Sequence, residues 1–417
     1  MRVLHTSDWH IGKLIGNFKI QDVHDSYLSY LEQVIINQKV DVLLISGDVF
    51  DTRSPSTTSQ RLFYLSMDRL LKQTNLQHIV VTSGNHDSPS VLSMIAPILE
   101  ASNLHIVTSC QVKDELLVLK DQQDKPFLQL MAAPFLRERE IRTNASGTTT
   151  TELSKALSDA ITAHFDRAEE EMERQFDPRI PTIGMAHLFA AGSLSKTIDK
   201  GDGVREIYVG GLDALSPTIF PSFCNYMALG HIHVPQVVGK SEYIRYSGSP
   251  IPLGFSEKEA KQMILLDFPD DATIPTIQVL SVPTFISLLH VKGKTKEEIF
   301  EKIATYQKIK ETLTDLVRET TYVEIIYTGD VSPTLKKEIT HYLESLDGSW
   351  ELSILNMLSS LQRLSRSQVK QELHQLSPKN VFSMIVGKEE SEKYQSLFDQ
   401  VFTEAEEEKA AENHETP

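Results

Sequence analysis

Five short polar clusters in the sequence carry side chains that commonly bind metal ions, and each follows an apolar run of strand length. They combine carboxylate and carboxamide oxygens with imidazole nitrogens, a ligand set that suits manganese, iron and zinc. Ligands in layered α/β folds bind at the carboxyl ends of strands, so this placement favours one shared site. The clusters are DWH (8–10), GDVFD (47–51), GNHD (84–87), His187 and GHIH (230–233).

The spacing within the clusters allows two ions to be held side by side. Asp8 and His10 are two residues apart, and His231 and His233 have the same spacing. On an extended segment, side chains two residues apart point the same way, so each pair could reach one ion. Asp48 follows a glycine that permits a sharp turn, and its two carboxylate oxygens could bridge two ions. The predicted metal ligands are Asp8, His10, Asp48, Asn85, His187, His231 and His233.

A site of this composition suits the hydrolysis of phosphodiesters. With Asp48 shared, each ion has four protein ligands and keeps open positions for water and a phosphate oxygen. His86 is next to a predicted ligand and could donate a proton to the leaving alkoxide. Asp51 or Asp87 could orient an imidazole ligand, as nearby carboxylates commonly do. We therefore predict His86 and Asp51 as the catalytic residues beside the metal ligands.

Each cluster taken alone has an ordinary structural explanation. A single histidine on a strand more often packs in the core or lies at the surface than binds a metal. GD and GNHD occur in plain turns, because Asp and Asn favour turns. Five such clusters at predicted strand ends are better explained by one shared metal site than by five separate structural roles.

The apolar runs between the clusters predict a layered α/β fold. Residues 40–46 are a continuous apolar run of strand length, residues 1–6 and 78–82 have the composition of short buried strands, and residues 22–38 and 59–73 carry apolar positions at helical spacing. Such alternation of strand and helix is typical of an α/β domain with buried sheets. A helix is expected at 150–175, and further strands at 116–120, 127–134, 180–188, 223–233, 244–250 and 261–268.

A polar stretch with a proline at 267–272 predicts a domain boundary, after which strands and helices alternate again without an obvious chemical cluster. The chain becomes rich in Ser and Gln after residue 357, then regains helical spacing and ends in an acidic segment. We predict a catalytic domain (1–268), a small α/β domain (273–357), a linker (358–377), a helical segment (378–403) and an acidic, disordered tail (404–417).

The order DxH, GDxxD, GNHD, lone histidine and GHxH resembles the calcineurin-like metallophosphoesterases. The surrounding residues resemble one branch of them, the SbcD family of Mre–Rad-type nucleases, strongly over residues 1–260 and by architecture beyond. The segments that carry this resemblance are LHTSDWHIGK (4–13), ISGDVFDTRSPS (45–56), VTSGNHDSP (81–89), YVGG (208–211), YMALGHIHVPQ (226–236) and IRYSGSPIPLGFSE (244–257).

The resemblance implies a four-layer β-sandwich flanked by helices, a small α/β capping domain that binds DNA and a C-terminal helix that docks on a partner. It also implies two manganese ions and a nuclease for DNA replication, recombination and repair, acting as exonuclease on duplex ends and endonuclease on single strands and hairpins. The implied assembly is a homodimer bound to two SbcC-type, SMC-like ATPases. Val234 and Gly254 depart from the expected pattern, which affects only local substrate contacts.

The net charge of −16 argues against a free-standing DNA binder, since such proteins are usually basic. Bound metals or a partner subunit could supply the missing positive charge. Lys13, Arg53 and Arg137 are candidates for phosphate contacts. The two distant cysteines are typical of reduced thiols, and no apolar run is long enough for a membrane span, so a cytoplasmic, nucleoid-associated protein is expected.

Two other functions fit parts of the sequence. The core motifs alone allow a phosphoesterase of small substrates, such as a nucleotidase or a cyclic-nucleotide phosphodiesterase, but the second domain and the C-terminal helix argue against it. A non-catalytic scaffold of the same fold would have lost ligands, whereas this chain keeps all seven candidates.

Overall fold

Residues 1–326 and 333–356 form one compact unit in the computed structural model of this chain. The structure describes residues 1–94, 103–137, 140, 150–190, 215–257, 259–270, 272–312, 320–329 and 334–357. Most of the second unit, 327–332 with 357–417, lies outside the described residues. The linker, helix and tail predicted at 358–377, 378–403 and 404–417 belong to that part.

The first sheet has six strands in the order β14-β13-β1-β4-β5-β6, and β1, β4, β5 and β6 run parallel. Strands β4 and β5 are buried along their whole length, which explains why they appear in the sequence as continuous apolar runs. The strands are β1 (Arg2–Thr6), β4 (Val42–Ser46), β5 (His78–Thr82), β6 (Leu104–Val107), β13 (Gln262–Asp267) and β14 (Thr276–Ser281).

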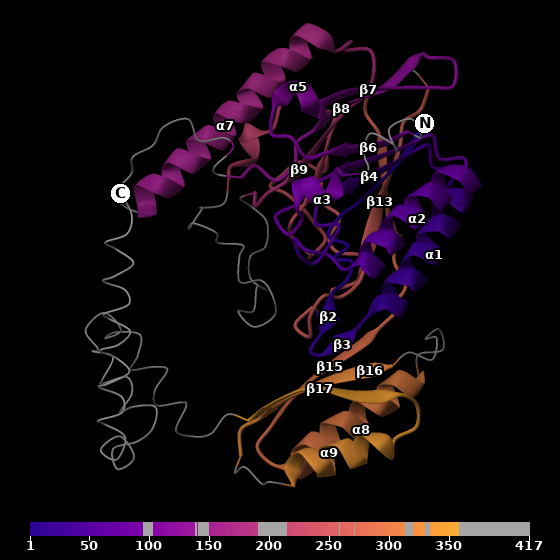
Figure 1. The fold of residues 1–417 in the computed structure, drawn as a ribbon, viewed down its shortest axis with the longest axis vertical. Coiled ribbons are helices and arrows are strands. Elements are labelled where there is room, and N and C mark those ends of the chain that lie inside the picture. Colours follow the sequence, from indigo (N-terminus) through magenta and orange to yellow (C-terminus); the bar gives the residue numbers. More distant parts are fainter. Residues whose placement is uncertain are drawn as a thin grey trace, which may run out of the picture. The chain divides into compact units, whose positions relative to one another are not determined.

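Helices α1 (Gln21–Gln38) and α2 (Thr57–Gln73) cover the outer face of this sheet and lie side by side (Figure 1). Their apolar side chains at helical spacing, such as Leu31 and Phe63, share one core cluster with the sheet. The hydroxyl of Ser56 caps the first turn of α2 and fixes where this helix begins after the GDVFD loop.

The second sheet also has six strands, in the order β11-β12-β10-β9-β8-β7. Helix α7 (Thr150–Gln175) covers its outer face with Phe165 and Met172, beside the short helix α5 (Val112–Glu115) (Figure 1). The strands are β7 (Leu116–Lys120), β8 (Pro126–Ala132), β9 (Thr182–His187), β10 (Tyr226–Gly230), β11 (Gln236–Val237) and β12 (Ile244–Tyr246).

The inner faces of the two sheets pack against each other. Val42 and Val80 of the first sheet share a core cluster with Met185 and Ala228 of the second. The layers are therefore helix, sheet, sheet and helix, which confirms the predicted four-layer α/β fold. Among the described residues, no helix has the length and apolar character needed to cross a membrane.

A third sheet, β15-β16-β17, follows with two helices that contact each other. The rings of Phe300 and Tyr342, one from each helix, stack 4.0 Å apart. These elements are β15 (Ser287–Gly293), α8 (Lys296–Thr312), β16 (Thr321–Tyr327), α9 (Leu335–Glu344) and β17 (Trp350–Met357). The alternation of strands and helices predicted here is confirmed, whereas the division into separate domains stays a prediction.

Strand β14 differs from the sequence prediction. It pairs with β13 in antiparallel register, so the first sheet continues to Ser281 beyond the boundary expected at residue 268. The reason is that β14 is an edge strand with mostly exposed side chains, so it lacks the apolar run that marks its neighbours. The other unexpected elements are short: β6, the hairpin β2 (Leu14–Ile15) and β3 (Phe18–Lys19), β11, α3 (Pro89–Leu92), α5 and the 3₁₀ turn Pro217–Ile219.

Candidate metal centre

The predicted ligands come from the carboxyl ends of parallel strands in both sheets. Asp8, Asp48 and Asn85 follow β1, β4 and β5 of the first sheet. His187 ends β9, and His231 follows β10 in the second sheet. Strands β9 and β10 are parallel to each other, and so are β1, β4 and β5 of the first sheet. The ends of these strands therefore bring the side chains together at one edge of the sandwich.

Three glycines let these strand ends approach one another closely. A Cβ atom on Gly47 would lie 2.2 Å from Nδ1 of His187, and one on Gly84 would lie 2.1 Å from Oδ1 of Asp48. A Cβ atom on Gly230 would lie 1.8 Å from the backbone oxygen of Ser46. Only glycine fits at these three places, which explains the Gly that precedes Asp48, Asn85 and His231 in the sequence.

The backbone at four predicted ligands adopts the left-handed region that is uncommon for residues other than glycine. The φ angles are 55° at Asp8, 46° at His10, 50° at Asp48 and 99° at His231. Such conformations cost roughly 1–3 kcal/mol each and persist where the surrounding structure enforces them. Here the backbone N–H of Asp8 donates to Gly47 O at 3.0 Å and that of His10 to Asp48 O at 3.0 Å, which fixes the two loops together.

One group of possible ligands consists of Asp8, His10 and His233, whose candidate atoms all lie within 4.8 Å of one another. Nδ1 of His10 lies 3.1 Å from Oδ1 of Asp51. Nδ1 of His233 lies 3.3 Å from Oε1 of Glu257. Each ring therefore directs Nδ1 at a carboxylate and keeps Nε2 available for an ion.

A second group consists of Asp48, His187 and His231. Nδ1 of His187 donates to the backbone oxygen of Ser46 at 2.9 Å, so its Nε2 faces Oδ2 of Asp48 at 3.2 Å and Oδ1 of Asn85 at 3.0 Å. Nδ1 of His231 lies 3.0 Å from the same Asn85 oxygen. The structure thus brings Asn85 into this group as well.

Asp48 lies between the two groups. Its Oδ2 is 3.2 Å from Nε2 of His187 and 3.6 Å from Nε2 of His10, while its Oδ1 accepts the backbone N–H of His86 at 2.9 Å. Burial opposes ionisation, but His187 and His10 outweigh it and hold the pKa of Asp48 well below its usual range. An ionised Asp48 is thus placed to serve two ions, and all seven predicted ligands meet here.

The comparisons with known proteins agree with this geometry. Residues 1–235 match the family described as "Calcineurin-like phosphoesterase". The SbcD subunit of the SbcCD nuclease from Escherichia coli K12 is 32% identical over 410 residues, which are 97% of this chain and 97% of that protein. The chain belongs to the calcineurin-like phosphoesterases and, among them, to the SbcD family. The sequence resemblance is therefore confirmed.

Some relatives match over less of their length. The SbcD subunit from Rhodobacter capsulatus is 33% identical over 267 residues, which are 62% of this chain and 64% of that protein. Among solved structures, GAP50, the anchor in the inner membrane complex of Plasmodium, covers 68% of this chain and 89% of its own at 11% identity. Its TM-score of 0.33 is too low to carry an argument.

The calcineurin-like family implies divalent metal ions, and the residues present fit them. Nε2 of His10 is buried and has no hydrogen-bond partner among the described residues. Nε2 of His187 faces two oxygens, an arrangement that is favourable only with a cation or a proton between them. Burial opposes that proton, but Asp48 outweighs burial and raises the pKa of His187 to about 9. A bound cation would replace this proton.

The two predicted catalytic residues lie beside the ligands of this phosphoesterase centre. Nδ1 of His86 donates to the backbone oxygen of Asp51 at 2.9 Å, and its ring lies 4.8 Å from the ring of His10. Burial opposes ionisation of Asp51, but the hydrogen bond from His10 and the nearby Lys13 lower its pKa to about 2. Their catalytic roles stay predictions.

Asp87 has a different position from Asp51. Its carboxylate accepts the backbone N–H groups of Val49, Phe50 and Gly84 at 3.1, 2.9 and 2.8 Å. Burial, with repulsion from Asp48, raises the pKa of Asp87 to about 6. Asp87 therefore joins the loops after β4 and β5, and of the two aspartates only Asp51 contacts an imidazole ligand within the described residues.

Sequence reasoning missed Phe135 and Glu257 beside the centre and gave Arg137 a different role. The ring of Phe135 lies 6.2 Å from that of His187 and 6.3 Å from that of His231. Arg137, predicted as a phosphate contact, is buried and donates to the backbone oxygens of Gly84 and Asp87. Glu257 stands behind His233. These are common residue types in loops, and only Glu257 gave a signal, through its place in the GFSE segment.

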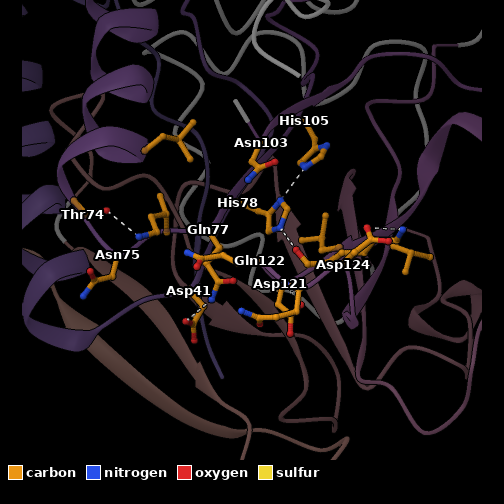
Figure 2. Close-up of a pocket in the computed structure, with 16 residues that line it drawn as sticks. Asp41, Thr74, Asn75, Gln77, His78, Asn103, His105, Asp121, Gln122 and Asp124 are labelled. Carbon is orange, nitrogen blue, oxygen red and sulfur yellow. Dashed lines mark hydrogen bonds and ion pairs between the residues drawn. The ribbon is translucent and has the colours of Figure 1, made fainter. Parts of the chain in front are cut away.

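A separate polar pocket lies near the opposite, amino-terminal ends of β5 and β6 (Figure 2). His78 and His105 line it with their ring nitrogens 3.1 Å apart, and Nε2 of His78 donates to Lys120 O at 2.8 Å. None of the predicted ligands lines this pocket, and its imidazoles bond to each other. The candidate chemistry therefore stays at the carboxyl ends of the strands.

Proposed function

We propose that this chain is a metal-dependent DNA nuclease, the nuclease subunit of an SbcC–SbcD-type complex. It would act as an exonuclease on duplex ends and as an endonuclease on single strands and hairpins. The observation that carries this proposal is the position of Asp48, which belongs to the group with His187 and His231 and lies 3.6 Å from His10 of the group with Asp8 and His233. The 32% identity to a nuclease subunit along 97% of both chains supports DNA as the substrate.

The chain's own residues would orient the substrate and move one proton. Two divalent ions bound at the centre would supply Lewis acidity and a water of low pKa. Asp51 would hold His10 in place through Nδ1, and Phe135 would limit the access of water beside His187 and His231. The leaving oxygen would take its proton from Nε2 of His86, because Nδ1 is engaged with the backbone of Asp51.

Manganese is the proposed metal. Four of the seven candidate ligands are imidazoles, which Mg²⁺ disfavours relative to oxygen ligands and water. EDTA should abolish cleavage, Mn²⁺ should restore it, and Mg²⁺ should restore it less well. Strong activity in Mg²⁺ free of manganese would contradict the proposed ligand set.

The proposed partner is an SbcC-type, SMC-like ATPase, bound by residues 378–403 within an assembly of two nuclease and two ATPase subunits. The support is the name of the relatives, which are SbcD subunits of SbcCD nucleases, and the helical spacing of apolar residues in this segment. Truncation after Gln375 should release the ATPase and keep metal binding. Such an assembly would work in the cytoplasm at the nucleoid.

The experiment that tests the nuclease proposal compares linear duplex DNA with a panel of nucleotides and cyclic nucleotides. The family match at residues 1–235 alone would allow small substrates, so this comparison separates the two functions. Cleavage of duplex DNA in Mn²⁺, with little turnover of nucleotides, is expected. Efficient nucleotide hydrolysis without DNA cleavage would reverse the assignment.

A further inference from the structure

Behind His233, on the side of Nδ1, lies a carboxylate that is itself held by a buried lysine. Oε1 of Glu257 is 3.3 Å from Nδ1 of His233. Its other oxygen, Oε2, accepts from Nζ of Lys261 and from the backbone N–H of Leu253. Lys261 is 9% exposed and also donates to the hydroxyl of Ser249 at 2.9 Å. The two oxygens of Glu257 thus have separate partners.

This arrangement fixes the orientation of the His233 ring. A carboxylate at Nδ1 holds the proton on that nitrogen, keeps Nε2 as the ligand atom and makes it a better electron donor. Lys261 balances the charge that would otherwise make burial of Glu257 costly. The loss of either oxygen's partner would therefore disturb the direction of the ring.

The two ligand groups differ in what stands behind their imidazoles. In the first group, His10 is backed by Asp51 and His233 by Glu257. In the second group, His187 is backed by a neutral backbone oxygen, that of Ser46. The first group also contains the carboxylate of Asp8, whereas the second contains the neutral amide of Asn85, and Asp48 of the second group also lies 3.6 Å from His10 of the first. With Asp48 shared, the first position therefore has one more carboxylate ligand than the second, and both of its imidazoles are backed by carboxylates that are themselves paired with lysines, Lys13 and Lys261.

We propose that Glu257, held by Lys261, is a positioning residue. It selectively raises the affinity for the ion that Asp8, His10, Asp48 and His233 bind. The two ions consequently bind with unequal affinity, and this position fills first. The inference rests on the proposed function for the presence of two ions, and it does not depend on DNA being the substrate.

The test is a titration of the metal-free, full-length protein with Mn²⁺, followed by calorimetry and by electron paramagnetic resonance. Wild type should show a tighter and a weaker binding event. Glu257→Ala should weaken the tighter event about 10- to 100-fold and leave the weaker event unchanged. Glu257→Gln keeps an oxygen for Nδ1 but loses the charge, so the tighter event should weaken less than in Glu257→Ala. The glutamine variant also replaces the alanine variant in the test if the latter unfolds.

The matched control is Glu242→Gln, which makes the same chemical change at an exposed carboxylate in the turn before β12. It should bind both ions as wild type does. Thermal unfolding in EDTA should be similar for wild type and Glu242→Gln, whereas Glu257→Ala leaves the buried Lys261 without its carboxylate and should unfold at a lower temperature. A merely structural role would lower stability without selecting one ion, so the selective loss of one binding event is the deciding readout.

Three outcomes would each overturn the inference: unchanged constants in Glu257→Ala, an equal loss at both positions, or a single ion in wild type. Selective loss of the tighter event supports it, even if wild type with both ions bound does not cleave DNA. In that last case the proposed nuclease function would fail while the positioning role stands.

Discussion

At the scale of single residues, a buried histidine outside the metal ligands makes the free energy of unfolding depend on pH. His5 on β1 is fully buried, and its Nδ1 lies 3.0 Å from the hydroxyl of Tyr226. Burial lowers the pKa of His5 to about 3, against a smaller opposite effect of a backbone hydrogen bond. As the pH falls below 6.5, the unfolded chain therefore takes up a proton that the folded chain excludes.

The sign of this linkage gives a prediction. The stability that neutral His5 contributes is present at pH 8 and is lost as the pH falls, by about 2 kcal/mol at pH 5. His5→Gln lacks this titration, so its loss of stability between pH 8 and pH 5 should be smaller by that amount. Urea unfolding in EDTA at both pH values measures the difference, and parallel losses in the two proteins would refute the assignment.

A second prediction concerns the proton donor. His86→Gln should lower the cleavage rate by roughly 10²- to 10⁴-fold, because the leaving oxygen loses its proton source. It should bind both Mn²⁺ ions, since Nδ1 of His86 bonds to the backbone of Asp51 and the residue is outside the seven candidate ligands. A rate like that of wild type, in a single-turnover assay with labelled duplex DNA, would exclude His86 as the donor.

The sequence could identify the candidate ligands because five clusters of aspartate, asparagine and histidine come at predicted strand ends, which single turns do not explain jointly. It could not identify the residues that hold them. Strands β11 and β12 separate Glu257 from His233 in the sequence, and Arg137 reaches Gly84 only through the packing of two sheets. Such contacts depend on the tertiary fold, which local residue types do not encode.

At the scale of elements, the approach of β10 to β4 depends on Gly230. A Cβ atom there would meet the backbone oxygen of Ser46 at 1.8 Å, and backbone cannot move aside as a flexible side chain can. Gly230→Ala should therefore lower the free energy of unfolding by about 3 kcal/mol and weaken metal binding.

The control for this substitution is Gly239→Ala. Gly239 has a φ of 63°, and a Cβ atom there would lie 3.7 Å from Pro217 in ordinary contact. Gly239→Ala should lower the free energy of unfolding by only about 1–2 kcal/mol, because alanine disfavours the left-handed backbone conformation. Chemical unfolding of both variants measures the difference, and equal losses would show that the contact with Ser46 is unimportant.

The elements themselves were predictable where burial imposes a pattern. Strands β1, β4 and β5 appear as apolar runs because both of their faces are covered, and α1, α2 and α7 show helical spacing because one face is covered. Strand β14 was missed because only β13 pairs with it among the described strands and most of its side chains are exposed. An edge strand is stabilised by pairing, which leaves little trace in its own composition.

At the scale of the whole molecule, the net charge of −16 predicts weak DNA binding by the isolated chain. Few phosphates can be neutralised outside the metal centre, so the affinity should be low and should fall with added salt. Fluorescence anisotropy with labelled duplex DNA, at increasing KCl concentration and without the partner, measures this. Tight binding at physiological salt would show a basic surface that the net charge conceals.

The central claim is that the centre formed around Asp48 drives phosphodiester hydrolysis. Its most direct test is cleavage of end-labelled duplex DNA by metal-stripped protein titrated with Mn²⁺, with wild type and Asp48→Asn side by side. Asp48 is within 3.2 Å of His187 Nε2 and 3.6 Å of His10 Nε2, so its loss should affect both ions. We predict no cleavage without metal, cleavage by wild type that rises until two ions are bound, and a rate at least about 100-fold lower in folded Asp48→Asn. Cleavage by Asp48→Asn at the wild-type rate, or by stripped wild type in EDTA, would contradict the account.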